Sequence, residues 1–276
     1  MEDLMEAISK NVVPSVKDED YIGDDGLLYC GKCHVPKQWR NTDGRIFPKY
    51  CDCEVIAWEE EQKEFKRRMR MDEIMNLRKE GIPDAEIASY RFANDDNAHP
   101  EASSVARKYA QQFETFLENG KGLMFFGNIG TGKTFLAAAI ANELIDKGYP
   151  VLVTTFSRLA NKIFALGADK QNYIDGLDRY SLLVIDDFAT ERSTEAMNEL
   201  IYTVIDSRYR SGKPIIITTN LSKNETTNDV PSKQRIYSRL REMTIPVKVV
   251  GEDRRTWKRD DELLELLGLK RGEQTE

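Results

Sequence analysis

Residues 127–134 read Gly-Asn-Ile-Gly-Thr-Gly-Lys-Thr and match the phosphate-binding pattern G-x-x-x-x-G-K-[ST] at each of its fixed positions. An apolar, strand-like run precedes them at Leu123–Phe126, and an alanine-rich, helix-forming run follows at Phe135–Leu144. A strand that leads through a glycine loop into a helix gathers free N–H groups and the helix dipole around phosphate oxygens. Because both flanks fit, we interpret this stretch as a nucleoside triphosphate site rather than a chance match of glycines.

The candidate nucleotide ligands are the loop residues Gly127, Asn128, Ile129, Gly130, Thr131, Gly132, Lys133 and Thr134. Lys133 can reach the terminal phosphates, and the hydroxyl of Thr134 can hold Mg²⁺. Further on, the apolar run Leu182–Ile185 ends in Asp186 and Asp187. Beside a phosphate loop, the first acid is expected to hold Mg²⁺ and the second to polarise the attacking water. The alternative is that the two acids simply begin a loop.

Other polar residues follow later strand-like and helix-like runs. Asn220 ends another apolar run and is predicted to orient the hydrolytic water, with a turn cap as the alternative. Arg235 and Arg239 are four residues apart and share a helix face. A guanidinium delivered to the γ-phosphate, often by a neighbouring subunit, stabilises charge that develops during transfer. Arg254 and Arg255 could act from the same chain, and a surface basic cluster is the alternative for each arginine.

From residue 121 onward, strand-like and helix-like runs alternate. The predicted strands are 122–127, 150–155, 181–186, 214–219 and 245–250, and the predicted helices are 132–147, 157–166, 194–211 and 232–242. The strands are continuous apolar runs, as in a parallel sheet covered on both faces. This alternation predicts a doubly wound α/β domain with a five-stranded parallel sheet, whose ligands bind at the carboxyl ends of the strands.

The four cysteines are Cys30, Cys33, Cys51 and Cys53, and none occurs elsewhere in the chain. The pattern C-x2-C-x17-C-x-C offers four thiolates, the number that a closed tetrahedral Zn²⁺ site requires. His34 could replace one thiolate, and reduced thiols without metal or redox chemistry are the alternatives. A segment this short cannot bury a core without such a staple, so we predict a structural zinc module.

The chain has 276 residues and a net charge of −7, so no overall basic field indicates nucleic acid. The charge is uneven, because residues 1–25 carry eight acidic and two basic side chains, whereas residues 231–259 carry nine basic and three acidic ones. A local basic surface late in the chain is therefore compatible with the acidic total. No apolar run reaches the length of a membrane span, and the N-terminus lacks a signal peptide pattern. We expect a cytoplasmic protein with no membrane partner.

These patterns predict three segments: a zinc-binding module at 1–54, a helical linker at 55–119, and a nucleotide-binding domain at 120–276. Within the linker, residues 55–80 predict an exposed charged helix and residues 101–119 an amphipathic helix. A short helix is predicted at 260–269.

The stretches Phe126–Leu136, Leu183–Phe188 and Asp206–Pro214 resemble the AAA+ helicase-loader family, which contains the DnaC and DnaI proteins and their transposition relative IstB. Gly251-Glu-Asp-Arg-Arg255 stands where the family tends to show Gly-Glu-Ser-Tyr-Arg. The likeness covers about residues 80–260. The N-terminal cysteine module resembles that of DnaI-like and prophage replication proteins.

The resemblance implies an ATPase in which Arg239 is the arginine finger, Asn220 the sensor-1 residue and Arg255 the sensor-2 residue. It also implies that the N-terminal module binds a replicative helicase while the ATPase domain binds single-stranded DNA. We therefore expect an ATP- and Mg²⁺-dependent loader of the hexameric replicative helicase, self-associating through its ATPase domain. Slow hydrolysis that partners stimulate is expected, because Asp187 is shorter than the glutamate common in AAA+ proteins.

Three other functions fit parts of the sequence. A transposition helper ATPase would bind duplex DNA and a transposase, an adaptor would use nucleotide only to stabilise a protein-binding platform, and a metabolic kinase would need a second substrate pocket.

Candidate contacts to single-stranded DNA are Thr155–Arg158, Tyr202, Arg208 and Tyr209, with ordinary helix packing as the alternative for each.

Overall fold

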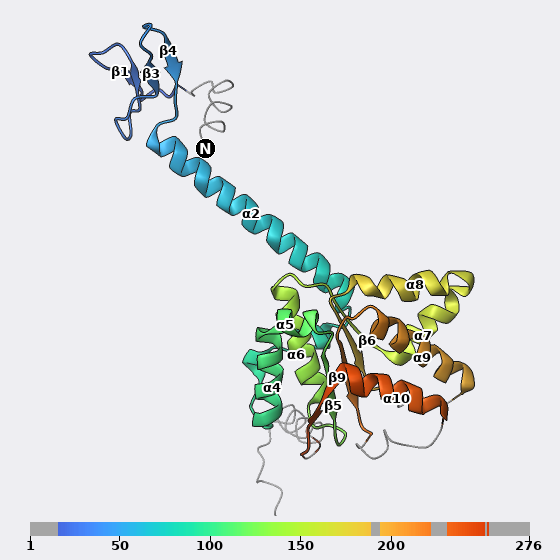
Figure 1. The fold of residues 1–276 in the computed structure, drawn as a ribbon. Coiled ribbons are helices and arrows are strands. Elements are labelled where there is room, and N and C mark those ends of the chain that lie inside the picture. Colours follow the sequence, from blue (N-terminus) through green and yellow to red (C-terminus); the bar gives the residue numbers. More distant parts are fainter. Residues whose placement is uncertain (1–15, 189–193, 222–230, 252, 254–276) are drawn as a thin grey trace, which may run out of the picture. The chain divides into compact units, whose positions relative to one another are not determined.

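The computed structural model describes residues 16–188, 194–221, 231–251 and 253, without the side chains of 231–233. The chain divides between Asp72 and Glu73 into two compact units (Figure 1). The predicted segment borders at residues 54 and 119 remain predictions. No described helix is long and apolar enough to cross a membrane.

The first unit contains two small antiparallel hairpins and the start of a long helix. The strands are β1 (Tyr21–Ile22) with β2 (Leu28–Tyr29), and β3 (Gln38–Arg40) with β4 (Ile46–Pro48). Helix α2 (Asp52–Gly81) confirms the predicted helix at 55–80 but begins three residues earlier, which places Cys53 in its first turn. Among the described residues of this unit, the buried apolar side chains are Leu28, Cys30 and Cys51. Thiols therefore form most of the small core of the unit.

The second unit contains a five-stranded parallel sheet in the order β6-β7-β8-β5-β9. Its strands are β5 (Gly122–Phe126), β6 (Val151–Thr155), β7 (Leu182–Asp186), β8 (Ile215–Thr219) and β9 (Thr244–Lys248). The predicted parallel sheet is confirmed, with each strand within two residues of its expected bounds. The strand before the phosphate loop, β5, lies between β8 and β9, and β8 separates it from β7. All five carboxyl ends therefore lie at the same edge of the sheet.

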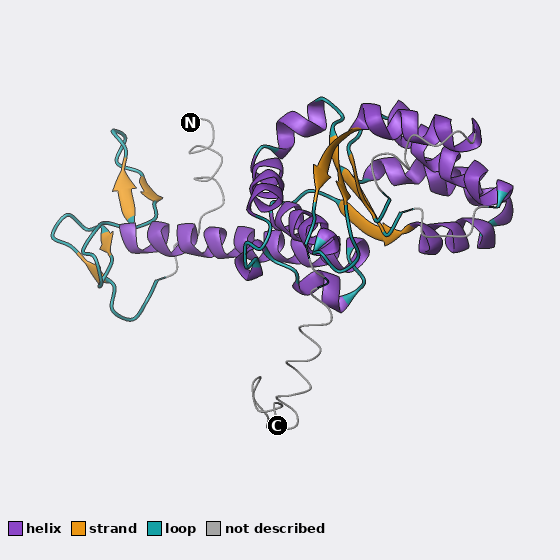
Figure 2. Cartoon of the chain, turned by 90° about the horizontal axis from the view of Figure 1, so that it is seen from below, coloured by secondary structure: helices purple, strands orange, loops and turns teal. Residues whose placement is uncertain are grey.

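Helices cover both faces of this sheet, as Figure 2 shows. On one face lie α4 (Pro100–Gln111) and α6 (Lys133–Asp146), and on the other lie α7 (Phe156–Ala165), α9 (Glu195–Arg210) and α10 (Pro231–Met243). Side chains of β7 alternate between the two cores, since Leu182 and Val184 face the first and Leu183 and Ile185 the second. This two-sided burial explains why the strands are continuous apolar runs.

The predicted helix at 101–119 is wrong as one continuous element, because the chain leaves helical geometry at Gln112. It forms α4 and a short α5 (Phe113–Glu118). The break lets Phe113 and Phe116 both pack against Tyr109, with ring centroids 5.9 and 4.5 Å away. Tyr109 also donates a hydrogen bond to the carbonyl of Lys121, just before β5. An aromatic cluster around Tyr109 thus accompanies the break in the helix.

The remaining elements are short and connect the larger ones. They are α3 (Ala85–Ser89), α8 (Lys170–Gly176) and the 3-10 helices η1 (Phe92–Asn94), η2 (Gly167–Asp169) and η3 (Leu177–Arg179). The predicted helix at 260–269 lies outside the described residues.

Candidate nucleotide site and metal centre

The glycine loop at 127–134 joins the carboxyl end of β5 to the N-terminus of α6. Its three glycines have positive φ angles: 146° at Gly127, 75° at Gly130 and 92° at Gly132. A side chain at position 127 is also excluded sterically, because a Cβ on Gly127 would lie 1.9 Å from the carbonyl oxygen of Val249. A loop with this backbone turns its N–H groups toward a common centre at a helix N-terminus, which is an anion-binding arrangement. The residues present therefore fit a triphosphate.

Lys133 lies at the loop itself. Its Nζ donates to the carbonyl oxygens of Gly127, at 3.0 Å, and of Asn128. Thr131 is buried and its Oγ1 donates to the carbonyl of Asn128 at 2.9 Å. The lysine charge is thus held within reach of anything the loop binds, as the sequence predicts for a residue that contacts the terminal phosphates.

Thr134, in the first turn of α6, contacts Asp186, the last residue of β7, although 52 residues separate them in the sequence. Thr134 Oγ1 donates to Asp186 Oδ1 at 2.8 Å. Burial raises the pKa of Asp186, while hydrogen bonds from Thr218 and Thr134 favour its ionised form. A largely buried carboxylate beside a hydroxyl supplies the hard oxygen ligands that Mg²⁺ prefers, and a cation there would offset the cost of burying the charge. The two predicted magnesium ligands therefore lie together.

Thr218, in β8, is a residue that the sequence reading missed. It is buried, donates through Oγ1 to Asp186 Oδ1 at 2.5 Å, and accepts from the backbone N–H of Asp187 at 2.9 Å. Its hydroxyl therefore contacts the carboxylate of Asp186 and the backbone of Asp187 at the end of β7. The only signal in the sequence was its position two residues before Asn220, which places the two residues on the same face of an extended chain.

Thr218→Val is expected to lower the turnover number for ATP about 10-fold with a small effect on nucleotide affinity. Valine keeps the shape but leaves Asp186 and the Asp187 N–H without this shared partner. Steady-state hydrolysis and nucleotide titration measure the effect. Thr219→Val is the matched control, because Thr219 is equally buried but donates to the carbonyl of Phe188. Equal turnover in the two variants would contradict a positioning role for Thr218.

Asp187 and Asn220 are both exposed at the carboxyl edge of the sheet. Asp187 has a φ of 53°, in the left-handed region that non-glycine residues seldom adopt, and Asn220 directly follows the last residue of β8. Strained backbone of this kind is frequent at functional sites. Both side chains are placed where they could contact water near a bound phosphate. Their roles in polarising and orienting that water stay predictions.

Another acid lies against the loop, on the segment that follows β9. A Cβ placed on Gly130 would lie 1.8 Å from Asp253 Oδ1, so Asp253 packs directly on this glycine. Because β9 pairs with β5, its carboxyl end runs beside the phosphate loop. Asp253 thus belongs to the wall of the site. Arg254 and Arg255, predicted to act here, lie outside the described residues.

The other arginines occupy distinct environments. Arg239 lies on α10 with its guanidinium against α9, and Arg235 is exposed. Arg208, a candidate for contact with DNA, is 1% exposed and donates to the carbonyl oxygens of Leu177, Tyr180, Ser181 and Pro214. Because its guanidinium donors are hydrogen-bonded to these buried carbonyl oxygens, Arg208 is a structural residue and not a DNA contact.

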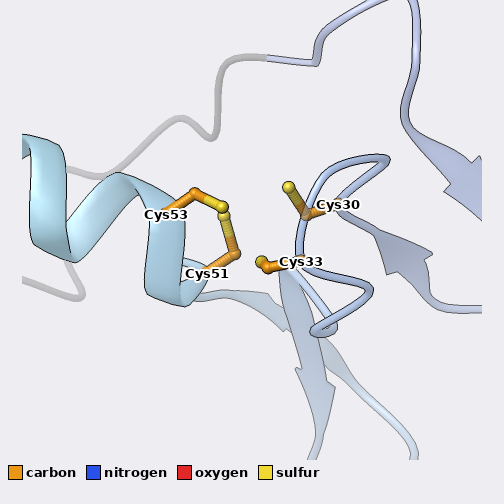
Figure 3. Close-up of side chains that lie close together, drawn as sticks. All are labelled: Cys30, Cys33, Cys51 and Cys53. Atoms are coloured by element: carbon orange, nitrogen blue, oxygen red, sulfur yellow. The ribbon is translucent and has the colours of Figure 1, made fainter.

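The four cysteines converge in the first unit (Figure 3). Cys30 and Cys33 come from the turn after β2, Cys51 directly precedes α2, and Cys53 lies in the first turn of α2. Their Sγ atoms all lie within 4.8 Å of one another. His34 is outside this group, because it is exposed and its Nδ1 lies 3.2 Å from the hydroxyl of Tyr21. Among the described residues, the cluster is therefore a four-thiol set.

The ionisation of these thiols depends on their surroundings. Backbone hydrogen bonds, from Cys53 above all, lower the pKa of Cys33 to about 6, whereas burial raises the pKa of Cys51 to about 12. Converging thiolates repel one another unless a cation lies between them. The nearby ammonium of Lys37 already pairs with Asp20, at 3.0 Å, and Glu54, at 2.9 Å. The donor set fits a tetrahedral Zn²⁺ ion.

The loop between strand and helix, the acid at the end of a neighbouring strand and the parallel sheet define a P-loop nucleotide-binding protein of the AAA+ type. The family model described as IstB-like ATP binding protein matches residues 52–259, and the chain belongs to this family. The predicted family and ATP binding are thereby confirmed.

Known relatives extend this result. The chain is 28% identical over 204 residues to the replicative helicase loader DnaC of Escherichia coli (strain K12), covering 68% of this chain and 80% of that protein. It is 24% identical over 222 residues to the replicative helicase loader DnaI of Bacillus subtilis (strain 168), covering 75% of this chain and 68% of that one. A crystal structure of DnaI matches with a TM-score of 0.52 and 23% identity, covering 62% of this chain and 96% of its own, which supports the fold.

Proposed function

We propose that this protein is an ATP-dependent loader that places a hexameric replicative helicase on single-stranded DNA in the cytoplasm. The observation that carries the proposal is the 28% identity to the loader DnaC, which extends over 80% of that protein and includes the phosphate loop. The site geometry supports it, because Lys133 lies at the phosphate loop and Thr134 contacts Asp186, as a nucleotide and magnesium site would require.

In this proposal, each residue of the site has a specific task. Lys133 and the loop N–H groups bind the β- and γ-phosphates, and Thr134 with Asp186 would hold Mg²⁺, which neutralises the developing phosphate charge. Asp187 polarises the attacking water and Asn220 orients it. Arg239 completes the site of a neighbouring copy, so the protein self-associates through the second unit, which carries the phosphate loop and is called the ATPase unit. Arg255 contacts the phosphates of its own chain.

Two features support slow hydrolysis that partners accelerate. The carboxylate of Asp187 is one methylene shorter than a glutamate, so it holds the water less closely. The trans-acting Arg239 is supplied only when copies assemble, and such an arginine contributes about 10³-fold or more to hydrolysis in related reactions. ATP binding would assemble the loader, and hydrolysis would release the helicase.

The zinc module is the proposed contact to the helicase. Its described surface carries several exposed apolar side chains, which is typical of a surface that binds another protein. They are Tyr21, Ile22, Trp39, Ile46, Phe47 and Tyr50. Trp39 and Phe47 stack with ring centroids 5.1 Å apart across the β3–β4 pair, so they present one rigid aromatic patch.

Co-purification with the replicative helicase tests this function. The full chain with ATP is expected to retain the helicase, whereas a chain without residues 1–72 should lose it and still bind ATP. Trp39→Ala with Phe47→Ala should weaken retention in the full chain, and Lys32→Ala, an exposed change in the same module, should not. Failure of the full chain to bind the helicase, or preferential binding of a transposase and duplex DNA, would contradict the proposal.

A further inference from the structure

The guanidinium of Arg239 lies in a receptacle formed by three side chains of α9. Its Nη2 is 2.5 Å from Asp206 Oδ1 and donates to the hydroxyl of Tyr202 at 3.3 Å. Its central carbon lies 4.6 Å from the ring centroid of Tyr209 and 5.6 Å from that of Tyr202. One carboxylate and two ring faces therefore fix both the position and the plane of this guanidinium.

The receptacle is itself held in place. Tyr202, Asp206 and Tyr209 are four and three residues apart, so they share one face of α9. Arg210 Nε pairs with the other oxygen of Asp206 at 3.1 Å, and the hydroxyl of Tyr209 donates to Glu242 on α10 at 2.8 Å. These contacts remove rotamer freedom from the groups that orient Arg239 before any partner arrives.

The receptacle leaves part of the Arg239 guanidinium available for another partner. Among the residues that the structure describes, only Nη2 of Arg239 has a hydrogen-bond or ion-pair partner, so Nε and Nη1 keep their donors. The side chain is 28% exposed. Arg208 shows the contrasting arrangement, because carbonyl oxygens accept from its Nε and both its Nη atoms. Arg239 is thus oriented and still able to bind an anion.

No contact within the described part of the chain joins Arg239 to the phosphate loop or to Asp186 and Asp187. We propose that Asp206, with Tyr202 and Tyr209, is a positioning residue that presents Arg239 to the nucleotide bound by a neighbouring copy of the chain. This inference rests on the proposed function, in which copies complete one another's ATP sites. An arginine side chain held in its productive orientation loses little further freedom when it meets a phosphate.

A subunit-mixing experiment on the full-length protein tests this role. A small amount of wild-type acceptor is mixed with excess donor that carries Asp187→Asn, so that most acceptor sites face a donor arginine. The turnover of donor alone is measured and subtracted. Adding Asp206→Asn to the donor is expected to lower the turnover number per acceptor about 10-fold, with the KM for ATP changed less than twofold. Asp206→Glu in the donor should restore part of the rate.

The defect should follow the donor. Acceptors that carry Asp206→Asn among donors with intact Asp206 should hydrolyse ATP at the rate of wild-type acceptors, which a general loss of stability would not produce. Glu199→Gln in the donor is the matched control, because it removes one charge from an exposed position of the same helix and should leave the rate unchanged.

Each other outcome has a distinct meaning. If donor Arg239→Ala lowers the rate and donor Asp206→Asn does not, the positioning role of Asp206 is wrong. The proposal that Arg239 acts on the site of a neighbouring copy would still be supported. If donor Asp206→Asn raises the rate, Asp206 restrains the arginine and the inference is overturned. If donor Arg239→Ala has no effect, both the inference and this part of the proposed function fail, while helicase binding by the zinc module is tested separately.

Discussion

Lys133→Ala is expected to lower the rate of ATP hydrolysis at least about 100-fold, the largest effect of any single change in the ATPase unit. The lysine ammonium lies at the loop, held by the carbonyl oxygens of Gly127 and Asn128. Removing it deletes the fixed positive charge that we propose contacts the terminal phosphates, in a site where burial makes charge interactions strong.

Steady-state hydrolysis at saturating ATP measures this effect, and nucleotide titration separates lost binding from lost turnover. Lys108→Ala is the matched control, because Lys108 is an exposed lysine of α4 in the same unit. Hydrolysis by Lys133→Ala within threefold of the control would contradict the assignment of the loop. Hydrolysis lost in both variants would indicate a general loss of folding instead.

The second large effect is expected in the zinc module. Cys51→Ser, or removal of metal by a chelator, should unfold residues 16–51, because metal binding in small thiolate sites contributes about 10 kcal/mol or more to folding. Cys51 is fully buried, and among the described residues of this unit Leu28 is the one buried apolar side chain that is not a cysteine. Without the metal, the unit has too little apolar core to offset the entropy of folding.

Metal content and limited proteolysis check this prediction. The wild-type protein should hold one zinc per chain and resist cleavage in the module, whereas Cys51→Ser should lose the metal, be cut there and keep its ATPase activity. Lys32→Ser changes an exposed residue between two of the cysteines and should keep both metal and protection. A metal-free module that stays protected, or a ratio far from one zinc per chain, would refute the zinc assignment.

The parts of the structure that depend on local motifs could be predicted from the sequence. The phosphate loop was predictable residue by residue, because glycines with positive φ angles and the residue types at fixed spacing determine its backbone. The contact between Thr134 and Asp186 was predictable in outline, since the carboxyl ends of parallel strands meet at one edge of a sheet. The cysteine cluster followed from its spacing.

Features that depend on tertiary placement were not predictable. The partners of Arg239 depend on how α9 and α10 are rotated against each other, and no short-range pattern encodes that rotation. The role of Thr218 depends on which strand lies beside β7. The break at Gln112 has no glycine or proline to mark it. The contact of Asp253 with Gly130 likewise requires knowing that β9 lies beside β5.

Transfer of the replicative hexamer to a circular single strand tests the central claim most directly. A circle has no end, so a closed ring of subunits can encircle it only if the ring is opened. We predict that the wild-type protein with ATP places labelled helicase stably on the circle, that Lys108→Ala does the same, and that Lys133→Ala does not. Equal loading by Lys133→Ala would show that nucleotide does not control the protein, and no loading by the wild type would contradict a loader function.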